Sequence, residues 1–204
     1  MLKTLVIFLS LIYITPAFCG DCLTYKKNPN ILVDVPNWQK KIVQPSAPLE
    51  KLHGNVEANL VNNYELVIEV MPVENGYCVS LKGIDATIGY DNFIVNIDME
   101  YEQNSCAYNA VLHHEDKHID AYLGIMTEFK SEIHQSLYSA ADSVMPIFIE
   151  SEGKVDAAVE DLNKEFISHP DLLLLSQKIN AAQEIRNKQI DNNENNAELF
   201  SCYN

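Results

Sequence analysis

Residues 109–123 read Asn-Ala-Val-Leu-His-His-Glu-Asp-Lys-His-Ile-Asp-Ala-Tyr-Leu, and they contain the pattern His114-Glu115-x-x-His118. Residues i and i+4 lie one above the other on a helix, so the two imidazoles of this pattern can reach one zinc ion. A glutamate directly after the first histidine is placed to act as general base toward a metal-bound water. We therefore take His114 and His118 as candidate metal ligands and Glu115 as the candidate catalytic residue.

The residues around this pattern indicate a helix with one buried face. At about 100° per residue, the apolar side chains form a single seam. Its members are Tyr108, Val111, Ile119, Tyr122, Met126, Phe129, Ile133 and Leu137. Glu115 falls in the middle of the seam and His118 at its edge, while the charged residues 113, 116, 117 and 120 point away. A carboxylate in a core-facing seam is costly unless it is paired or serves a metal site. This favours a metal site over a solvated helix face or a metal-free polar core.

Residues 1–20 are typical of a secretory signal peptide. Lys3 supplies the positive charge, residues 5–14 are almost wholly apolar, and residues 17–20 offer small side chains for cleavage. The apolar run is too short to span a bilayer. Phe18 before the cysteine argues against lipid modification. We expect an exported protein, secreted or periplasmic, with no membrane anchor.

The remaining chain, residues 21–204, has the length of one domain and is long enough to bury a core. The net charge is −15 for the whole sequence, and it becomes −16 once the segment that carries Lys3 and no acidic residue is removed. Such a charge disfavours nucleic acid and anionic membranes as partners. We expect a single domain with no nucleic-acid partner, and the sequence does not indicate its oligomeric state.

Four cysteines follow the predicted signal peptide: Cys22, Cys78, Cys106 and Cys202. An even number in an exported chain predicts two disulfides rather than buried free thiols. Four cysteines allow three pairings, and the sequence alone does not choose among them. Because Cys78 lies in a predicted strand and Cys106 at the start of the motif helix, we favour Cys78 with Cys106 and Cys22 with Cys202.

The segment before the motif has the character of β-structure. Residues 21–63 are rich in Asn and Pro, which fits an entry segment with one edge strand. Four β-rich runs follow, at residues 65–71, 77–81, 84–90 and 93–99. The turn-forming pairs Asn75-Gly76, Lys82-Gly83 and Asp91-Asn92 separate them. This alternation predicts an antiparallel meander.

The segment after residue 103 has helical character. Asn104 or Ser105 is a suitable N-cap for the motif helix, which the apolar seam carries toward Met145, and Pro146 marks its end. Two more helices are predicted at residues 152–166 and 172–190, with a loop at residues 191–196. The predicted fold is α+β, with an N-terminal antiparallel β-meander packed on a long HExxH helix, followed by C-terminal helices.

Residues 106–118, Cys-Ala-Tyr-Asn-Ala-Val-Leu-His-His-Glu-Asp-Lys-His, resemble the uncharacterised bacterial proteins described as predicted secreted zinc-dependent proteases. In that family a β-meander leads into a helix with the HExxH pattern, and the similarity in layout covers roughly residues 66–191. It implies zinc ligation by His114 and His118 and catalysis by Glu115, and Asp120 matches an acidic residue of the family. Some members end with a Tyr-Asp…Thr-x-His-Gly segment. Its nearest counterpart here, residues 190–194, lacks the histidine and the glycine.

The third metal ligand is not given by the motif. The longer pattern HExxHxxGxxH would require Gly at 121 and His at 124, but the chain has Ala121 and Gly124. On the motif helix itself, Glu132 lies above His114 on the wheel but about 27 Å away along the axis. The ligand is therefore expected from a segment that returns past the motif.

A chain reversal near Pro146 would bring residues 169–174 level with His118. Of the residues there we prefer His169, because imidazole suits zinc, and Asp171 is the second choice. If the last helix instead doubles back, Asp191 and Glu194 become the candidates. For each of them, capping or solvation is the alternative interpretation.

These observations predict a secreted zinc-dependent metallopeptidase that uses Zn²⁺ and a metal-activated water to hydrolyse a peptide or protein substrate. The alternative is a non-catalytic exported module with the same fold, which binds metal or an envelope component. Tyr122, one turn after His118, is a further candidate, as a hydrogen-bond donor to an oxyanion. Core packing is the alternative role for its ring.

Overall fold

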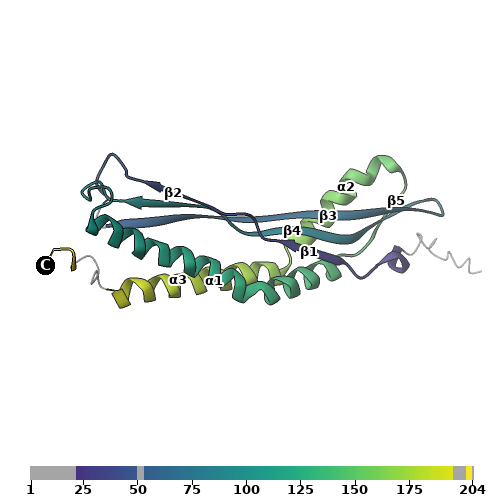
Figure 1. The fold of residues 1–204 in the computed structure, drawn as a ribbon. Coiled ribbons are helices and arrows are strands. Elements are labelled where there is room, and N and C mark those ends of the chain that lie inside the picture. Colours follow the sequence, from purple (N-terminus) through teal and green to yellow (C-terminus); the bar gives the residue numbers. More distant parts are fainter. Residues whose placement is uncertain (1–21, 50–52, 195–200, 204) are drawn as a thin grey trace, which may run out of the picture.

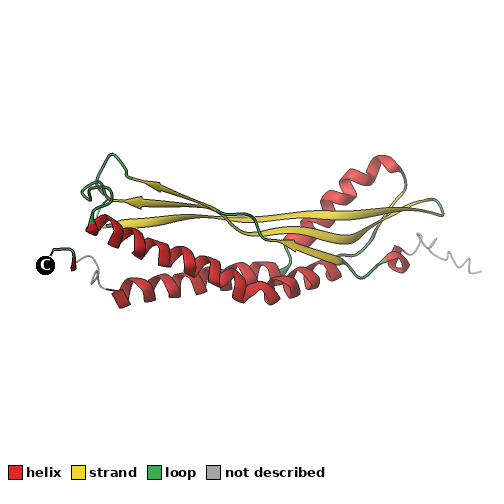
Figure 2. Ribbon diagram, in the orientation of Figure 1, coloured by secondary structure: helices red, strands yellow, loops and turns green. Residues whose placement is uncertain are grey.

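Two long strands form the body of the sheet in the computed structural model, which describes residues 22–49, 53–194 and 201–203. Strand β3 (Gly54–Val73) pairs antiparallel with β4 (Gly76–Ile97) along its whole length. The turn between them places Asn75 at a φ of 66°, a conformation that asparagine tolerates better than most residues. The molecule is elongated, and its helices α1 and α3 run along one face of the sheet (Figures 1 and 2). The predicted signal peptide lies outside the described residues.

The predicted antiparallel meander is wrong, because the sheet is mixed. Strands β1 (Asn30–Asp34) and β2 (Gln39–Val43) both pair parallel with β4, opposite β3. The short strand β5 (Ile147–Ile149) pairs antiparallel with the beginning of β4. Strand β4 is thus the central strand, with neighbours on both sides. The segment before residue 63, for which one edge strand was expected, holds β1, β2 and the first half of β3.

Of the three turn signals that predicted the meander, Asn75-Gly76 forms a turn, whereas Lys82-Gly83 and Asp91-Asn92 lie inside β4. Val67 pairs with Gly83 and Ile68 with Leu81, so Lys82 is an extra residue in β4. In the same way Asp91 is inserted between the partners of Asn59 and Leu60. Both pairs of turn-forming residues therefore mark β-bulges, which bend a strand without ending it. Four predicted runs become one hairpin of two long strands.

Helix α1 (Cys106–Ser143) carries the motif across the sheet. Ser105, one of the two predicted N-caps, accepts a hydrogen bond from the Tyr108 backbone N–H. The helix passes Gly124 without a break and ends before Pro146, which cannot continue a helix. Its buried residues face the core side chains of β4, among them Phe93, Val95 and Ile97.

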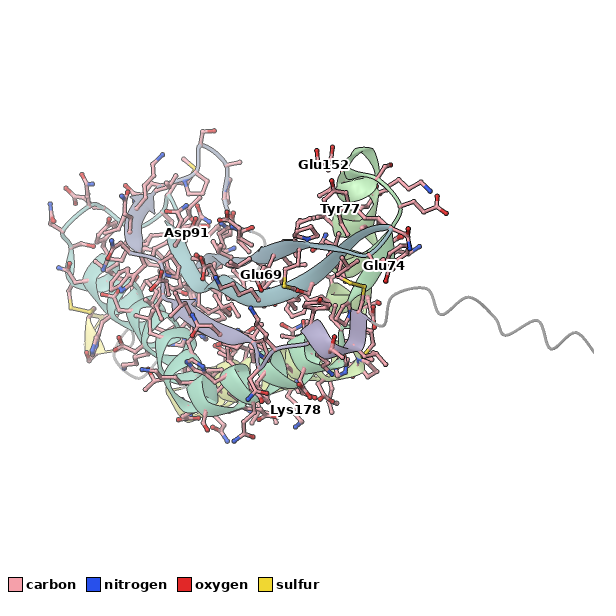
Figure 3. The ribbon with its side chains drawn as sticks, turned by 90° about the vertical axis from the view of Figure 1, so that its right-hand side faces the viewer. Glu69, Glu74, Tyr77, Asp91, Glu152 and Lys178 are labelled. Carbon is pink, nitrogen blue, oxygen red and sulfur yellow. A yellow bond between two sulfur atoms is a disulfide. The ribbon has the colours of Figure 1, made fainter. Side chains whose placement is uncertain are left out.

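Two further helices follow β5. Helix α2 (Val155–Ile167) begins after a 3-10 turn at Glu152–Lys154 and packs Phe166 edge-on against Tyr64 of β3. Near the hairpin end, Tyr77 donates a hydrogen bond to Glu152, which raises the pKa of the tyrosine (Figure 3). Helix α3 (Pro170–Glu194) is longer than predicted, because the segment expected to be a loop after residue 190 continues it to Glu194.

Helices α1 and α3 run antiparallel, side by side. Glu132 of α1 pairs with Lys178, Glu128 with Arg186 at 2.5 Å, and residues near the start of α1 meet the end of α3. Glu132, which helix geometry excluded as a ligand, thus forms an ion pair with α3, as does Glu128. No helix among the described residues is long and apolar enough to cross a membrane.

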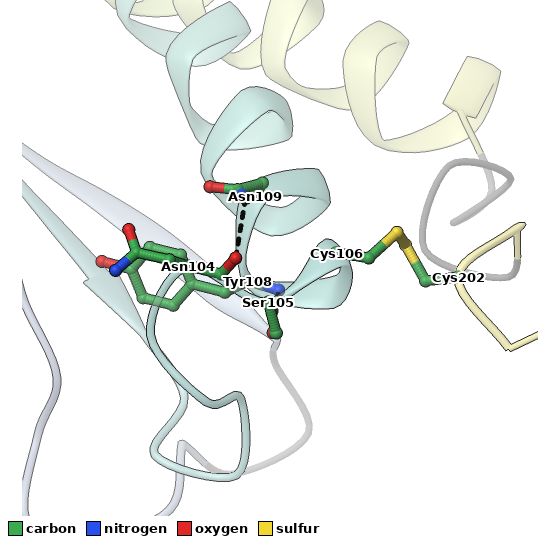
Figure 4. Close-up of a disulfide and its surroundings, with 6 residues drawn as sticks. All are labelled: Asn104, Ser105, Cys106, Tyr108, Asn109 and Cys202. Carbon is green, nitrogen blue, oxygen red and sulfur yellow. Dashed lines mark hydrogen bonds between the residues drawn. A yellow bond between two sulfur atoms is a disulfide. The ribbon is translucent and has the colours of Figure 1, made fainter.

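Two disulfides are present, as predicted, but the favoured pairing is wrong. Cys22, in a 3-10 turn at Cys22–Tyr25, bonds to Cys78 of β4. Cys106, the first residue of α1, bonds to Cys202 (Figure 4). The prediction failed because it paired the cysteine of a strand with that of the next element in sequence. In the structure each disulfide instead ties a segment near one end of the chain to the sheet or to α1.

Candidate metal centre

Helix α1 places His114, Glu115 and His118 on two adjoining sides of one helical turn. Glu115 faces the sheet, whereas the two histidines face α3. The rings of His114 and His118 stand nearly perpendicular, with centroids 5.0 Å apart. The His118 side chain is 11% exposed and that of His114 is 28% exposed, so the pair lies at the boundary between core and solvent.

Asp191 joins the two histidines from α3. Its Oδ1 lies 3.1 Å from His118 Nε2 and 3.4 Å from His114 Nε2, and the two Nε2 atoms are 3.3 Å apart. The three residues are the one group among the described residues whose ligand atoms lie close enough to hold a metal ion. Asp191 was one of four sequence candidates for the third ligand.

The separations between these three atoms are those of a tetrahedral zinc site. Zinc binds nitrogen and oxygen ligands at about 2.0–2.1 Å, so two ligand atoms at tetrahedral angles stand about 3.3–3.4 Å apart. The three measured separations, 3.1, 3.3 and 3.4 Å, agree with this value to within about 0.3 Å. Two imidazoles and a carboxylate are also a donor set that zinc accepts. The residues present therefore fit the ion.

Behind the histidines, Asn187 connects α3 to α1. Its Oδ1 lies 3.0 Å from His118 Nδ1, and its Nδ2 donates to the Tyr122 hydroxyl at 3.0 Å. Tyr122 in turn packs its ring against Tyr90 and Phe93 of β4. Tyr122, a candidate from the sequence, is thus linked to the candidate ligand His118 through Asn187, whose amide nitrogen donates to the tyrosine hydroxyl. Its role as an oxyanion donor stays a prediction.

Glu115 is the most deeply buried member of the motif, with 4% of its surface exposed. Its Oε1 lies so close to Gly54 that a Cβ on that glycine would stand 2.7 Å from it, and 3.0 Å from the Asn96 carbonyl oxygen. Burial, with the nearby carboxylates of Asp191 and Asp116, raises the pKa of Glu115 to about 8. A cation held by the three ligands would favour its ionised form.

Among the described residues, the other acidic residues considered for the site lie elsewhere or make other contacts. Asp116 pairs with Lys40 at 2.8 Å and so links α1 to β2. Asp120, which the family resemblance suggested, is exposed on α1 and is not part of the three-residue group. The side chain of Glu194 lies outside the described residues.

The preference for His169 as third ligand is wrong. His169 accepts a hydrogen bond from the Asp171 backbone N–H at 3.3 Å, and so caps the start of α3. Asp191 lies about six turns further along that helix, roughly 30 Å away. The prediction assumed that the chain reverses at Pro146. Instead β5 intervenes, and the chain turns back before α2, because Glu152 lies beside Tyr77 at the hairpin end and Phe166 beside Tyr64 in the middle of β3.

Two residues of the site were missed from the sequence. Asn187 lies one helical turn before Asp191, so the i, i+4 spacing would have placed both on one face once the helix was extended past residue 190. Gly54 has no such signal, because its importance comes from a close approach between β3 and α1.

Comparison of the chain with known protein families, with curated proteins and with solved structures found no match.

Proposed function

We propose that the chain is an exported zinc-dependent metallopeptidase whose metal ligands are His114, His118 and Asp191. The observation that carries the proposal is the triangle of ligand atoms at 3.1, 3.3 and 3.4 Å, next to a buried glutamate that directly follows the first histidine. The resemblance of residues 106–118 to predicted secreted zinc-dependent proteases agrees with it.

Each residue has a defined task in this proposal. Zinc, when bound, lowers the pKa of a water molecule and polarises a carbonyl group. His114 and His118 supply neutral nitrogen ligands, and Asp191 supplies an oxygen whose charge partly offsets that of the ion. Glu115, which directly follows His114 and packs against Gly54, would accept the proton of the attacking water and pass it to the leaving amine.

The position of the site suits a substrate from outside the molecule. The Asp191 side chain is 57% exposed and that of His114 is 28% exposed, so one side of the ligand group is open to solvent. Three protein ligands also leave a fourth zinc position for water or substrate, as catalytic zinc sites require. The two disulfides support export, because such bonds form and persist in oxidising compartments.

The experiment compares zinc content and peptide hydrolysis in a set of variants. Purified wild-type protein should hold about one zinc per chain. His114→Ala and His118→Ala should lose it, whereas Glu115→Gln should keep zinc and lose hydrolysis. The matched control is His113→Ala, an exposed histidine beside the motif, which should retain both.

The result also separates the two function classes. The tight packing of Glu115 against Gly54 favours the alternative of a non-catalytic metal-binding module, since a general base must reach its water. If wild-type protein binds zinc but hydrolyses no peptide, and Glu115→Gln leaves zinc binding unchanged, the non-catalytic module is correct. If wild-type protein binds no zinc, the metallopeptidase and the metal-binding module are both excluded, and the envelope-binding form of the alternative stays.

A further inference from the structure

We propose that Asn187 and Tyr122 are positioning residues that set the metal affinity of the site by fixing one tautomer of His118. This inference rests on the metal centre proposed above and deepens it. It concerns a chain of contacts that runs from the core of the sheet, through Tyr122 and Asn187, to a metal ligand.

The direction of the hydrogen bonds carries the argument. The amide nitrogen of Asn187 is occupied as a donor to the Tyr122 hydroxyl, which turns the amide oxygen toward His118 Nδ1. An oxygen can only accept, so the His118 Nδ1 must carry the proton. A neutral imidazole protonated at Nδ1 presents its lone pair at Nε2. That is the atom 3.3 Å from His114 Nε2 and 3.1 Å from Asp191 Oδ1.

Without this contact, His118 has a competing arrangement. Its Nε2 lies within hydrogen-bond distance of the Asp191 carboxylate, and a proton on Nε2 would satisfy that contact while removing the lone pair a metal needs. In the orientation that the structure has, with the amide oxygen toward His118, Asn187 opposes this tautomer, because two lone pairs would then face each other. The asparagine therefore favours the state of His118 that binds metal.

Tyr122 keeps the Asn187 side chain in place beside His118. A hydroxyl can partner either end of an amide, so this contact fixes the position of the amide, and in the structure the amide nitrogen is the end that donates to Tyr122. The Tyr122 ring is held between α1 and β4, with ring centroids 5.2 Å from Tyr90 and 6.1 Å from Phe93. The position of the residue that contacts a proposed metal ligand is thus fixed by aromatic packing in the core.

Removing the hydrogen-bond partner of a ligating histidine usually weakens metal binding by about 10- to 100-fold. The test is to measure zinc affinity, by competition with a chromogenic chelator, in Asn187→Ala, Asn187→Leu and Asn187→Asp. The first two remove the acceptor and should bind zinc about 10- to 100-fold more weakly. Asp restores an acceptor for the same N–H and should bind at least as tightly as wild type. Tyr122→Phe should weaken binding by less than Asn187→Ala.

Asn192 supplies matched controls on the same helix. It is exposed and lies beside Asp191, so Asn192→Ala controls for helix propensity and Asn192→Asp for added charge near the metal. Both should bind zinc within a few-fold of wild type. In the zinc-loaded ¹⁵N-labelled protein, the His118 Nδ1 proton should exchange slowly with solvent in wild type and Asn187→Asp, and rapidly in Asn187→Ala.

The outcomes distinguish this inference from the proposed function. Absence of zinc from the wild-type protein would end the proposed function. Zinc binding that is equal in wild type and Asn187→Ala would overturn the positioning role alone, and so would an Asn187→Asp affinity as weak as that of Asn187→Ala. If Asn192→Asp tightens binding by well over a few-fold and by the same factor as Asn187→Asp, charge and not hydrogen bonding is the cause, and the inference is also wrong.

Discussion

The two helices that form the site contribute to it in different ways. Helix α1 supplies His114, Glu115 and His118 within five consecutive residues, so their relative positions follow from helix geometry alone. Helix α3 supplies Asn187 and Asp191 from about 70 residues away in sequence, and their positions depend on packing between helices. The contribution of α1 is therefore local and that of α3 is tertiary. Changes that weaken the packing of α3 on α1 should lower zinc affinity while leaving the three motif residues in their positions on α1.

The largest expected effect comes from removing the ligand on α3. In the proposed metal site Asp191→Ala would remove a direct ligand, so zinc affinity should fall by more than about 100-fold, the upper end of the effect of removing a residue that only hydrogen-bonds to a ligand. The secondary structure should not change, because Asp191 is exposed and lies near the end of its helix. Chelator competition measures the loss. Unchanged affinity would show that α3 does not complete the site.

The disulfides allow a matched test of the same comparison. Cys106–Cys202 and Cys22–Cys78 close loops with sequence separations of 96 and 56. Replacing either pair by serine should lower the free energy of unfolding by about 4–5 kcal/mol on the chain-entropy model. Only loss of Cys106–Cys202 should also weaken zinc binding, since that bond connects the segment after α3 to the start of α1. Denaturant titration and chelator competition on both variants test this. Equal effects on zinc would contradict it.

The burial of Glu115 has a measurable effect on stability. Its pKa is raised by burial to about 8, so the folded metal-free protein binds a proton that the unfolded chain releases near pH 4.5. The folded state then binds more protons than the unfolded state between those values, and stability must fall as pH rises through that window. The free energy of unfolding should fall by a few kcal/mol across this pH window.

Glu115→Gln has no such charge. The difference in unfolding free energy between metal-free wild type and this variant should grow from pH 4.5 to pH 8 in favour of the variant. Denaturant titrations across this range measure it. A difference that does not vary with pH would show that Glu115 is not a buried ionisable group.

The smallest of these effects concerns the contact between α1 and the sheet. In Gly54→Ala the new methyl group would meet the Glu115 carboxyl at 2.7 Å and the Asn96 carbonyl oxygen at 3.0 Å. The glutamate must move, at a cost of about 1–3 kcal/mol typical of overpacking. Hydrolysis should decrease while zinc is retained.

The control for Gly54 is another glycine. Gly153→Ala places its methyl group in open space, with no atom within 4 Å, and should alter neither stability nor hydrolysis by much. Thermal unfolding, zinc content and peptide hydrolysis are compared in both variants. Loss of zinc in Gly54→Ala would mean that the glycine supports the ligands and not the base.

The same division explains what the sequence could predict. The seam around Glu115, the N-cap at Ser105 and the continuity through Gly124 are local patterns, and α1 has all of them. Sheet topology is not local. The parallel pairing of Asn30 with Gly83 leaves no signal in either segment, and the bulges at Lys82 and Asp91 have the composition of turns. Sequence patterns therefore gave the helix and misassigned the sheet.

The prediction of the third ligand failed for a related reason. Asp191 was a candidate only on the condition that the last helix doubles back, and the Asn-rich sequence around it suggested a loop. Tertiary packing against α1 overrides that local preference and continues α3 to Glu194. The choice of His169 depended on the number of residues after Pro146, which says nothing about an intervening strand and helix.

The bond between Cys106 and Cys202 bears on the order in which the protein matures. His118 is synthesised 73 residues before Asp191, which at about 5–20 residues per second is several seconds earlier. During that interval the histidine pair exists without its third ligand. The disulfide beyond Asp191 forms only in an oxidising compartment. On the proposed function, full zinc affinity would therefore be acquired only after export, and hydrolysis inside the cell that makes the protein would be avoided without a separate inhibitor. Zinc uptake by reduced, refolding chains should accordingly lag behind helix formation and coincide with the appearance of the Cys106–Cys202 bond.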